Sequence, residues 1–188
     1  MEKKDELTPK QLDECVLKAQ NGDTDSFAKI YDQFVDRIYK YVFFRVGRED
    51  ALDLTEAVFL KVWENIKSYK TGRQYLSSWI YRIAHNAVVD HYRMSKQTVE
   101  LTTNIPDEKQ ETNPIVLTER KLSQESLVKA ISKLKKKYQQ VIVLKYVNEL
   151  DNKEIAKIMN KTEGGMRILK FRALKALRQI MEEMDVRY

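Results

Sequence analysis

The sequence predicts an all-α protein made of two small helical domains joined by a flexible linker. Charged residues make up 33% of its 188 residues, whereas only 5 are Gly and 3 are Pro. Such a composition is typical of helices and lacks the frequent turns of an all-β protein. Apolar residues also recur at helical spacing in two long stretches, which a polar segment separates. We therefore expect domains at residues 1–94 and 123–188, with the linker at 95–122.

Four helices are expected in the first domain. Apolar positions between residues 12 and 46 predict two amphipathic helices, with the Asn-Gly-Asp turn at 21–23 between them. A third helix is expected from about residue 49 to 67, and a fourth from 77 to 93. Four helices of this length can share one hydrophobic core.

The second domain follows residues 95–122, where the helical periodicity is lost and two of the three prolines occur. Its apolar pattern predicts helices near 124–134, 138–147, 152–159 and 163–183. We therefore expect the second domain to be helical throughout.

The net charge of +6 is confined to the second domain. Residues 123–188 contain 15 basic and 8 acidic side chains, whereas residues 1–95 contain 15 of each sign. This asymmetry indicates a polyanionic partner for the second domain and leaves the balanced first domain to be explained in another way.

Several classes of protein are not indicated. Cys15 is the single cysteine, so no internal disulfide can form, and no Cys/His cluster has metal-ligand spacing. No apolar stretch approaches the roughly 20 residues that span a bilayer, and the start lacks the hydrophobic core of a signal peptide. We expect a cytoplasmic protein without a metal, cofactor or small-molecule substrate. Asp53 and Glu56 share a helix face, but catalysis is not expected without a histidine partner, phosphate loop or activated nucleophile.

Residues 151–178 have the pattern of a helix-turn-helix. Asp151 and Glu154 have the spacing of a capping box, and Thr162 is a good N-cap for the second helix. The first turns of such a helix offer side chains to base edges in the major groove of DNA. A solvated basic face of an ordinary bundle helix is the alternative, which the localised charge and the capping pattern disfavour. The candidates for DNA contact are Thr162, Glu163, Gly164, Arg167, Ile168, Lys170 and Phe171.

Two adjacent glycines lie in the first turn of this second helix. We expect Gly164 to let the backbone N–H groups approach a phosphate closely, as helix N-termini do. Gly165 is expected only to loosen the helix start, so that Gly165→Ala leaves DNA binding intact or improves it.

The first domain carries motifs that resemble those of the sigma-70 family of transcription initiation factors. The segment DLTEAVFLKVW at 53–63 resembles the family's region 2.2 signature, and SWIYRIAHN at 78–86, continuing to Arg93, resembles the segment that follows it. Residues 22–42 are similar to the family's opening helices, and the helix-turn-helix occupies the place of its promoter-reading domain. The short two-domain form resembles the extracytoplasmic-function group.

This resemblance implies a factor that binds the β′ clamp and β flap of core RNA polymerase, recognises the −10 and −35 promoter elements and promotes DNA opening without a cofactor. It also implies an anti-sigma factor as a partner, and action in the cytoplasm at the bacterial nucleoid. A stand-alone helix-turn-helix regulator that does not dock on polymerase is the main alternative. A balanced, separate first domain with a region 2.2-like helix would be of little use to such a regulator.

The resemblance also implies sites in the first domain. The polymerase-binding set is Asp53, Glu56 and Leu60. Most of the apolar residues of that helix are expected in the core; they are Leu54, Val58, Phe59, Leu60 and Trp63. Trp79 is likewise expected in the core. The set for the −10 element combines cations, a stacking ring and polar groups. Its members are Arg73, Gln74, Tyr75, Ser77, Arg82, Asn86 and Arg93.

Overall fold

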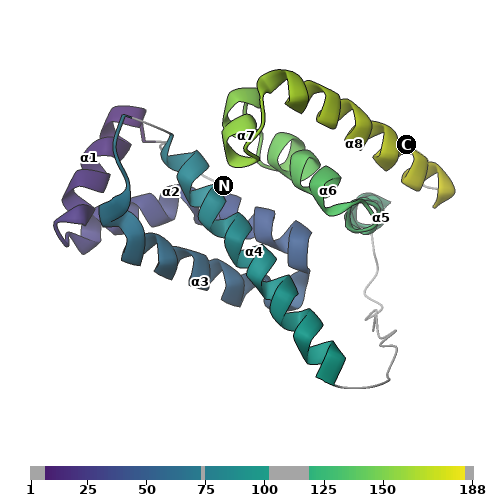
Figure 1. The fold of residues 1–188 in the computed structure, drawn as a ribbon, viewed down its shortest axis with the longest axis horizontal. Helices are drawn as coiled ribbons and strands as arrows, with labels where there is room; N and C mark the ends of the chain where they lie inside the picture. The colour runs from purple at the N-terminus through teal and green to yellow at the C-terminus, as the bar shows by residue number, and fades with distance from the viewer. Residues whose placement is uncertain (1–6, 73–74, 102–118, 185–188) are drawn as a thin grey trace.

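The computed structural model describes residues 7–72, 75–101 and 119–184. Eight α-helices and no strand lie within these ranges, so the all-α prediction is confirmed (Figure 1). The first half contains α1 (Pro9–Gln20), α2 (Thr24–Val46), α3 (Arg48–Asn65), the short 3₁₀ helix η1 (Ile66–Ser68) and α4 (Leu76–Leu101). The second half contains α5 (Glu119–Ser132), α6 (Lys136–Ile142), the π-helical turn η2 (Val143–Val147), α7 (Asn152–Ile158) and α8 (Glu163–Glu183).

Helix boundaries in the first half follow from local capping. Thr8 and Gln11 form a capping box at the start of α1, and the Asp23 side chain accepts hydrogen bonds from the first backbone N–H groups of α2. Gly47 has a φ of 93°, which a residue with a side chain rarely adopts, and it separates α2 from α3. The four long helices then bury one apolar core, which includes Ile30, Phe34 and other large side chains.

The second half contains the predicted helix-turn-helix. Asp151 and Glu154 make both bonds of the capping box at the start of α7, and Thr162 Oγ1 accepts from the backbone N–H of Gly165 at 3.1 Å. Asn160 makes the turn between α7 and α8 with a φ of 50°. The inward-facing residues of α7 and α8 are buried as expected; they include Ile155, Ala156, Met166, Leu169 and Ala173.

Two boundaries differ from the sequence prediction. The single helix expected at 138–147 is α6 followed by a π-helical turn, in which the backbone hydrogen bonds change their register. Helix also occupies both ends of the segment expected as a linker, because α4 continues through Leu101 and α5 begins at Glu119. No proline or glycine interrupts residues 95–101, which explains why α4 continues. The remainder of the expected linker, 102–118, lies outside the described residues.

Both apolar and polar contacts join the two halves. Helix α4 lies against α7, and α2 lies against η2 and α5 (Figure 1). The Gln139 side chain donates to the backbone carbonyl of Phe44 at 2.7 Å, and Asn148 donates to the carbonyl of Arg37 at 2.6 Å. Both amides are buried. The chain is therefore closed, with the start of the helix-turn-helix resting on the first half.

Candidate protein and nucleic-acid interfaces

One exposed face of α3 carries the three residues predicted to bind a protein partner. Asp53, Glu56 and Leu60 are all exposed, and their spacing of three and four places them on one side of the helix. Leu60 is 60% exposed, so the prediction that it also belongs to the core is wrong. The core side of α3 is formed by Val58, Phe59 and neighbours, and Leu60 points away from it. Leu52, two turns before Leu60, is 58% exposed and was not singled out from the sequence.

An aromatic groove of about 330 Å³ lies beside this face, between α2 and α3. Its walls hold two edge-to-face ring pairs: Phe27 with Trp63 at 4.8 Å and Tyr31 with Phe59 at 4.7 Å between ring centroids. The groove lining is Thr24, Phe27, Tyr31, Glu56, Phe59, Leu60 and Trp63. Glu56 and Leu60 thus join the predicted binding face to a concave apolar surface. Sequence reasoning missed it because a pattern along one helix does not show which residues of another helix complete a groove.

The loop before α4 meets the second half of the chain. Among its predicted DNA contacts, Arg73 and Gln74 lie outside the described residues. Tyr75 is half exposed, and the ammonium of Lys157 on α7 lies 4.3 Å from the centre of its ring. The Ser77 hydroxyl donates to the Glu154 carboxylate at 2.5 Å. Two candidate residues for nucleic-acid contact are therefore engaged with the helix-turn-helix, which the sequence did not predict.

Farther along α4, the remaining candidates lie on the solvent side. Arg82, Asn86 and Arg93 are exposed, and Arg93 forms a surface ion pair with Asp90 at 3.7 Å. Their spacing of four and seven keeps them on one helical face. This face of α4 is exposed in the closed chain, whereas the start of the helix contacts α7. Trp79, which was expected in the core, is half-buried; it packs against the core and against Tyr69, with ring centroids 5.3 Å apart.

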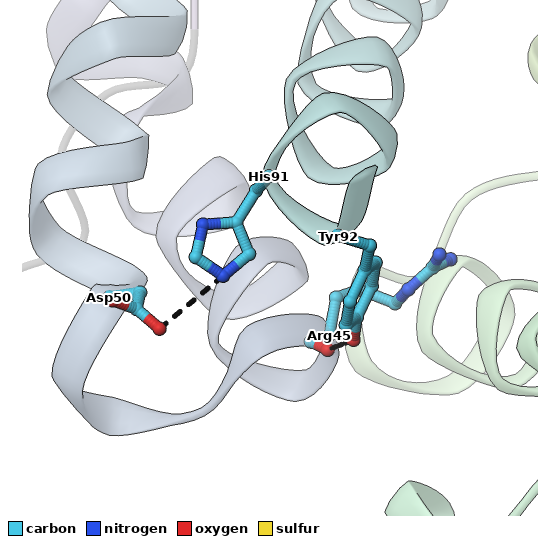
Figure 2. Close-up of polar contacts among 4 residues, drawn as sticks. All are labelled: Arg45, Asp50, His91 and Tyr92. Atoms are coloured by element: carbon cyan, nitrogen blue, oxygen red, sulfur yellow. Dashed lines mark hydrogen bonds and ion pairs between the residues drawn. The ribbon is translucent and has the colours of Figure 1, made fainter. Parts of the chain in front are cut away.

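The two histidines of α4 serve different contacts, as their spacing of six predicts. His91 Nε2 lies 3.4 Å from the Asp50 carboxylate of α3, and Figure 2 shows this pair apart from Tyr92 and Arg45. The Tyr92 hydroxyl donates to the backbone carbonyl of Arg45. No group of three or more His, Cys, Asp or Glu residues within the described ranges could hold a metal ion.

His85 lies at the boundary between the two halves. Its Nδ1 is 3.1 Å from Gln140 Nε2 of α6 and 3.4 Å from the Tyr41 hydroxyl of α2. Burial, together with the positive charge of Arg45, holds the pKa of His85 below its usual value of 6.5. Burial also raises the pKa of Tyr41 to about 12, so its hydroxyl keeps its proton at neutral pH. At neutral pH His85 is therefore an uncharged hydrogen-bond partner between two helices.

The first turns of α8 present a mixed polar and apolar surface. Thr162, Glu163, Gly164 and Arg167 are exposed and Lys170 is half-buried. Large apolar side chains that the helix does not bury accompany them, since Ile168 is 57% and Phe171 69% exposed. Leu174, one turn beyond Phe171, is also exposed and continues this stripe. It was missed, although the spacing of three that joins it to Phe171 and Ile168 is visible in the sequence.

The two glycines of α8 have different surroundings. A Cβ added at Gly164 would meet nothing within 4 Å, whereas one at Gly165 would lie 3.2 Å from Thr162 Oγ1. That oxygen is the one that caps the helix through the Gly165 N–H. A side chain at Gly165 would therefore crowd the cap, which gives a reason for the second glycine beyond loosening the helix start.

Family models match both halves of the chain. Residues 30–98 match sigma-70 region 2, and residues 124–177 match sigma-70, region 4. The first range contains α3 and most of α4, and the second contains α7 and most of α8. None of the helices in the described ranges is long and apolar enough to cross a membrane.

Relatives and solved structures agree with these matches. The chain is 30% identical to the ECF RNA polymerase sigma factor SigW of Bacillus subtilis, over 90% of this chain and 96% of that protein. It is 31% identical to the ECF RNA polymerase sigma factor BldN of Streptomyces coelicolor, over 90% of this chain but 66% of BldN, so it spans just under two thirds of that relative.

Two solved complexes contain a similar fold. CnrH, solved with the cytosolic domain of CnrY, gives a TM-score of 0.71 at 16% identity. The alignment covers 94% of this chain and 99% of the CnrH chain. The sigma factor RpoE of Bartonella quintana, solved with the anti-sigma factor NepR, gives a TM-score of 0.69 at 17% identity. That alignment covers 83% of this chain and 96% of RpoE. At these identities the likeness supports the fold alone.

Proposed function

The chain belongs to the extracytoplasmic-function group of sigma-70 family RNA polymerase sigma factors and so acts in transcription initiation; we propose how its surfaces divide that work. The exposed face of α3 binds the β′ clamp of core polymerase. The loop before α4 and the exposed face of α4 bind the −10 element, and the start of α8 binds the −35 element. The chain works without a cofactor and catalyses no reaction, as a non-enzymatic initiation factor.

The observation that carries this division is the exposure of Leu60 beside the aromatic groove. A leucine that is 60% exposed at the edge of an apolar concavity contributes little to the fold, and such anchors are typical of protein–protein interfaces. Asp53 and Glu56 flank it with negative charge, which supports a partner surface carrying basic residues. A stand-alone regulator that never docks on polymerase would not need this face, so that alternative is not favoured.

The start of α8 has the chemistry for promoter DNA. The exposed cation Arg167 can bond to a base edge or a phosphate, and Ile168 and Phe171 can contact thymine methyl groups in the major groove. Free N–H groups at the Thr162-capped start suit a phosphate. On α4, Arg82, Asn86 and Arg93 are proposed to follow the −10 strand in the same way.

The proposed boundaries follow the predicted ones, with polymerase and −10 binding in residues 1–94 and −35 binding in 123–188. We also propose an anti-sigma factor as a partner, since RpoE, which has a similar fold, was solved with the anti-sigma factor NepR. The closed arrangement of this chain keeps Tyr75 and Ser77 against α7, so DNA opening requires the halves to separate there. The place of action is proposed to be the nucleoid in the cytoplasm.

Binding of the full chain to core polymerase tests the α3 assignment. Leu60→Ala should weaken binding about tenfold or more, because truncation removes an anchor of the interface. Leu17→Ala is the matched control, since Leu17 of α1 is 51% exposed but lies outside the groove lining. Equal affinities of the two variants in a fluorescence titration with core enzyme would contradict the assignment.

A further inference from the structure

Side-chain amides and hydroxyls cross the interface between the two halves, beside buried apolar residues of both halves that belong to one hydrophobic cluster. Gln139 and Asn148 donate to backbone carbonyls of α2, Ser77 donates to Glu154, and Gln140 meets His85. Interfaces between parts of one chain commonly allow relative motion of those parts. A change in a single buried polar group can therefore shift the balance between closed and open forms.

His85 is the one of these groups that can change its charge near neutral pH. It lies on α4 and is half-buried, and its partner Gln140 on α6 is 6% exposed. The Gln140 amide nitrogen only donates, so the Nδ1 that it meets at 3.1 Å must be an unprotonated acceptor. The amide also bonds to the Tyr41 hydroxyl, which places its nitrogen toward both partners. Protonation of Nδ1 would set two donors against each other inside the interface.

The charges around His85 make its protonated form less favourable still. From α2 the Arg45 guanidinium faces this region; Arg45 is 5% exposed, and within the described parts of the chain its Nε and Nη1 have no hydrogen-bond partner. Lys136 of α6 is exposed and lies over the ring of Tyr92, seven residues beyond His85, so the buried cation of this region is Arg45. A protonated His85 would therefore join a region that already holds buried positive charge.

The remaining titratable groups do not offset that charge. Tyr41 on α2 and Tyr81 on α4 keep their protons at neutral pH, because burial raises the pKa of each hydroxyl. Glu154 of α7 is bound to Ser77, eight residues before His85 on α4 and so about 12 Å away along the helix axis. The acidic partner of the second half is thus bound to Ser77, and it is not among the groups that shift the pKa of His85.

We propose that His85 is a proton-sensitive latch between the two halves: when neutral it holds α6 against α4, and when protonated it releases α6. The latch itself stands on these contacts alone. Its consequence, that Tyr75 and Ser77 become free for DNA, rests on the proposed function. The pH of the surroundings is then a direct input to the closed form.

The direction of the pH effect follows from the lowered pKa. In the open form His85 is exposed and titrates near its usual 6.5, whereas in the closed form its pKa is lower. The hydrogen bond between His85 and Gln140 therefore stabilises the closed form fully above pH 6.5. As the pH falls below 6.5 the open form takes up a proton first, and the contribution is lost as the pH passes through the lower pKa of the closed form.

Small-angle X-ray scattering of the free full chain between pH 8 and pH 5 tests the latch. The radius of gyration should be constant above pH 6.5 and rise below it, with the open-to-closed ratio increasing at least threefold. Circular dichroism at each pH checks that the helices stay folded. His85→Gln should abolish the rise, and a wild-type chain without any rise would overturn the proposal.

Two further variants separate the latch from general acid sensitivity. His91→Gln is the matched control: His91 is on the same helix but pairs with Asp50 of the first half, so the pH response should remain. Gln140→Glu places a carboxylate against His85 and should reverse the response, because a protonated His85 then gains an ion pair. A Gln140→Glu chain that still opens in acid would contradict the assigned partner.

Core binding is measured separately at pH 7.5, where His85→Gln should bind like the wild type. Loss of all core binding by the wild-type chain would refute the proposed function but leave the latch intact. An unchanged radius of gyration with normal core binding would refute the latch alone.

Discussion

The effects of the exposed Gly164 on helix stability and on DNA binding can be separated. Its backbone is helical and a Cβ would meet nothing within 4 Å, so the fold itself does not require a glycine there. Alanine loses less conformational entropy in a helix. If the helix start lies against a phosphate, however, the added methyl group would keep the two apart.

We therefore expect Gly164→Ala to stabilise the chain by about 0.5 to 1 kcal/mol and to weaken −35 DNA binding. Urea unfolding and fluorescence anisotropy with a −35 duplex measure the two effects. Gly165→Ala is the comparison, since its Cβ would crowd Thr162 Oγ1 at 3.2 Å and so offset the gain in stability. Full DNA affinity of Gly164→Ala would show that no phosphate lies close to this position.

At the scale of an element, α7 depends on a cap that also serves the interface. One Glu154 oxygen accepts from the Asp151 backbone N–H at 3.3 Å, and the other accepts from Ser77 at 2.5 Å. Asp151 Oδ1 in turn accepts from the Glu154 N–H at 2.7 Å. The start of the helix-turn-helix is thus built from the same carboxylate that holds the two halves together.

Asp151→Ala should lower the free energy of unfolding by about 0.5 to 2 kcal/mol, the usual cost of losing an N-cap. The contact with Ser77 should remain, because the Asp151 backbone N–H that holds the Glu154 carboxylate is still present. Chemical denaturation measures the loss of stability, and the radius of gyration checks that the halves stay together. Lys153→Ala, an exposed substitution on the same helix, should change the free energy of unfolding by no more than about 0.5 kcal/mol and leave the radius of gyration unchanged.

The sequence predicted most helices well and one interface poorly, for physical reasons. Helices such as α2 and α8 were located to within a few residues because capping residues and apolar periodicity are local signals. The π-helical turn after α6 was missed, since apolar periodicity does not distinguish it from a continuous α-helix.

The candidate sites likewise divide into those that local sequence patterns predict and those that they do not. The exposed faces of α3 and α8 could be predicted, because spacing on one helix decides them. The aromatic groove, the Glu154–Ser77 contact and the His85–Gln140 contact could not, because each joins elements far apart in the sequence. Leu60 was expected in the core as well as at the interface because hydropathy alone does not distinguish a buried apolar residue from an exposed anchor.

At the scale of the whole molecule, the unequal distribution of charge predicts how DNA binding depends on salt. The excess positive charge lies in residues 123–188, but the cations of α8 are spread around the helix and Arg178 already bonds Glu182 at 2.8 Å. About three of them can face one DNA duplex. Counterion release then gives a loss of about 10- to 100-fold in −35 duplex affinity between 50 and 200 mM salt.

Anisotropy titrations of the full chain at several salt concentrations measure this slope. Arg167→Ala should reduce the slope by about one unit, as expected for the loss of one phosphate contact, or leave it unchanged while relaxing base preference if Arg167 reads a base. A fall of 10⁴-fold or more would mean that most cations of the second half contact DNA, which the arrangement of α8 does not allow.

The two halves belong to one chain, and this decides which ligands can displace one half from the other. Contacts between tethered parts form at an effective concentration on the order of millimolar, so dilution of the protein does not open them. A ligand that occupies only the covered loop before α4 must displace the second half at that concentration. On the proposed assignment of the surfaces, polymerase with promoter DNA engages α3, α4 and α8 together and so gains several contacts for each one it breaks. Through avidity, the closed chain would bind DNA alone weakly and would open when polymerase and promoter DNA bind it together.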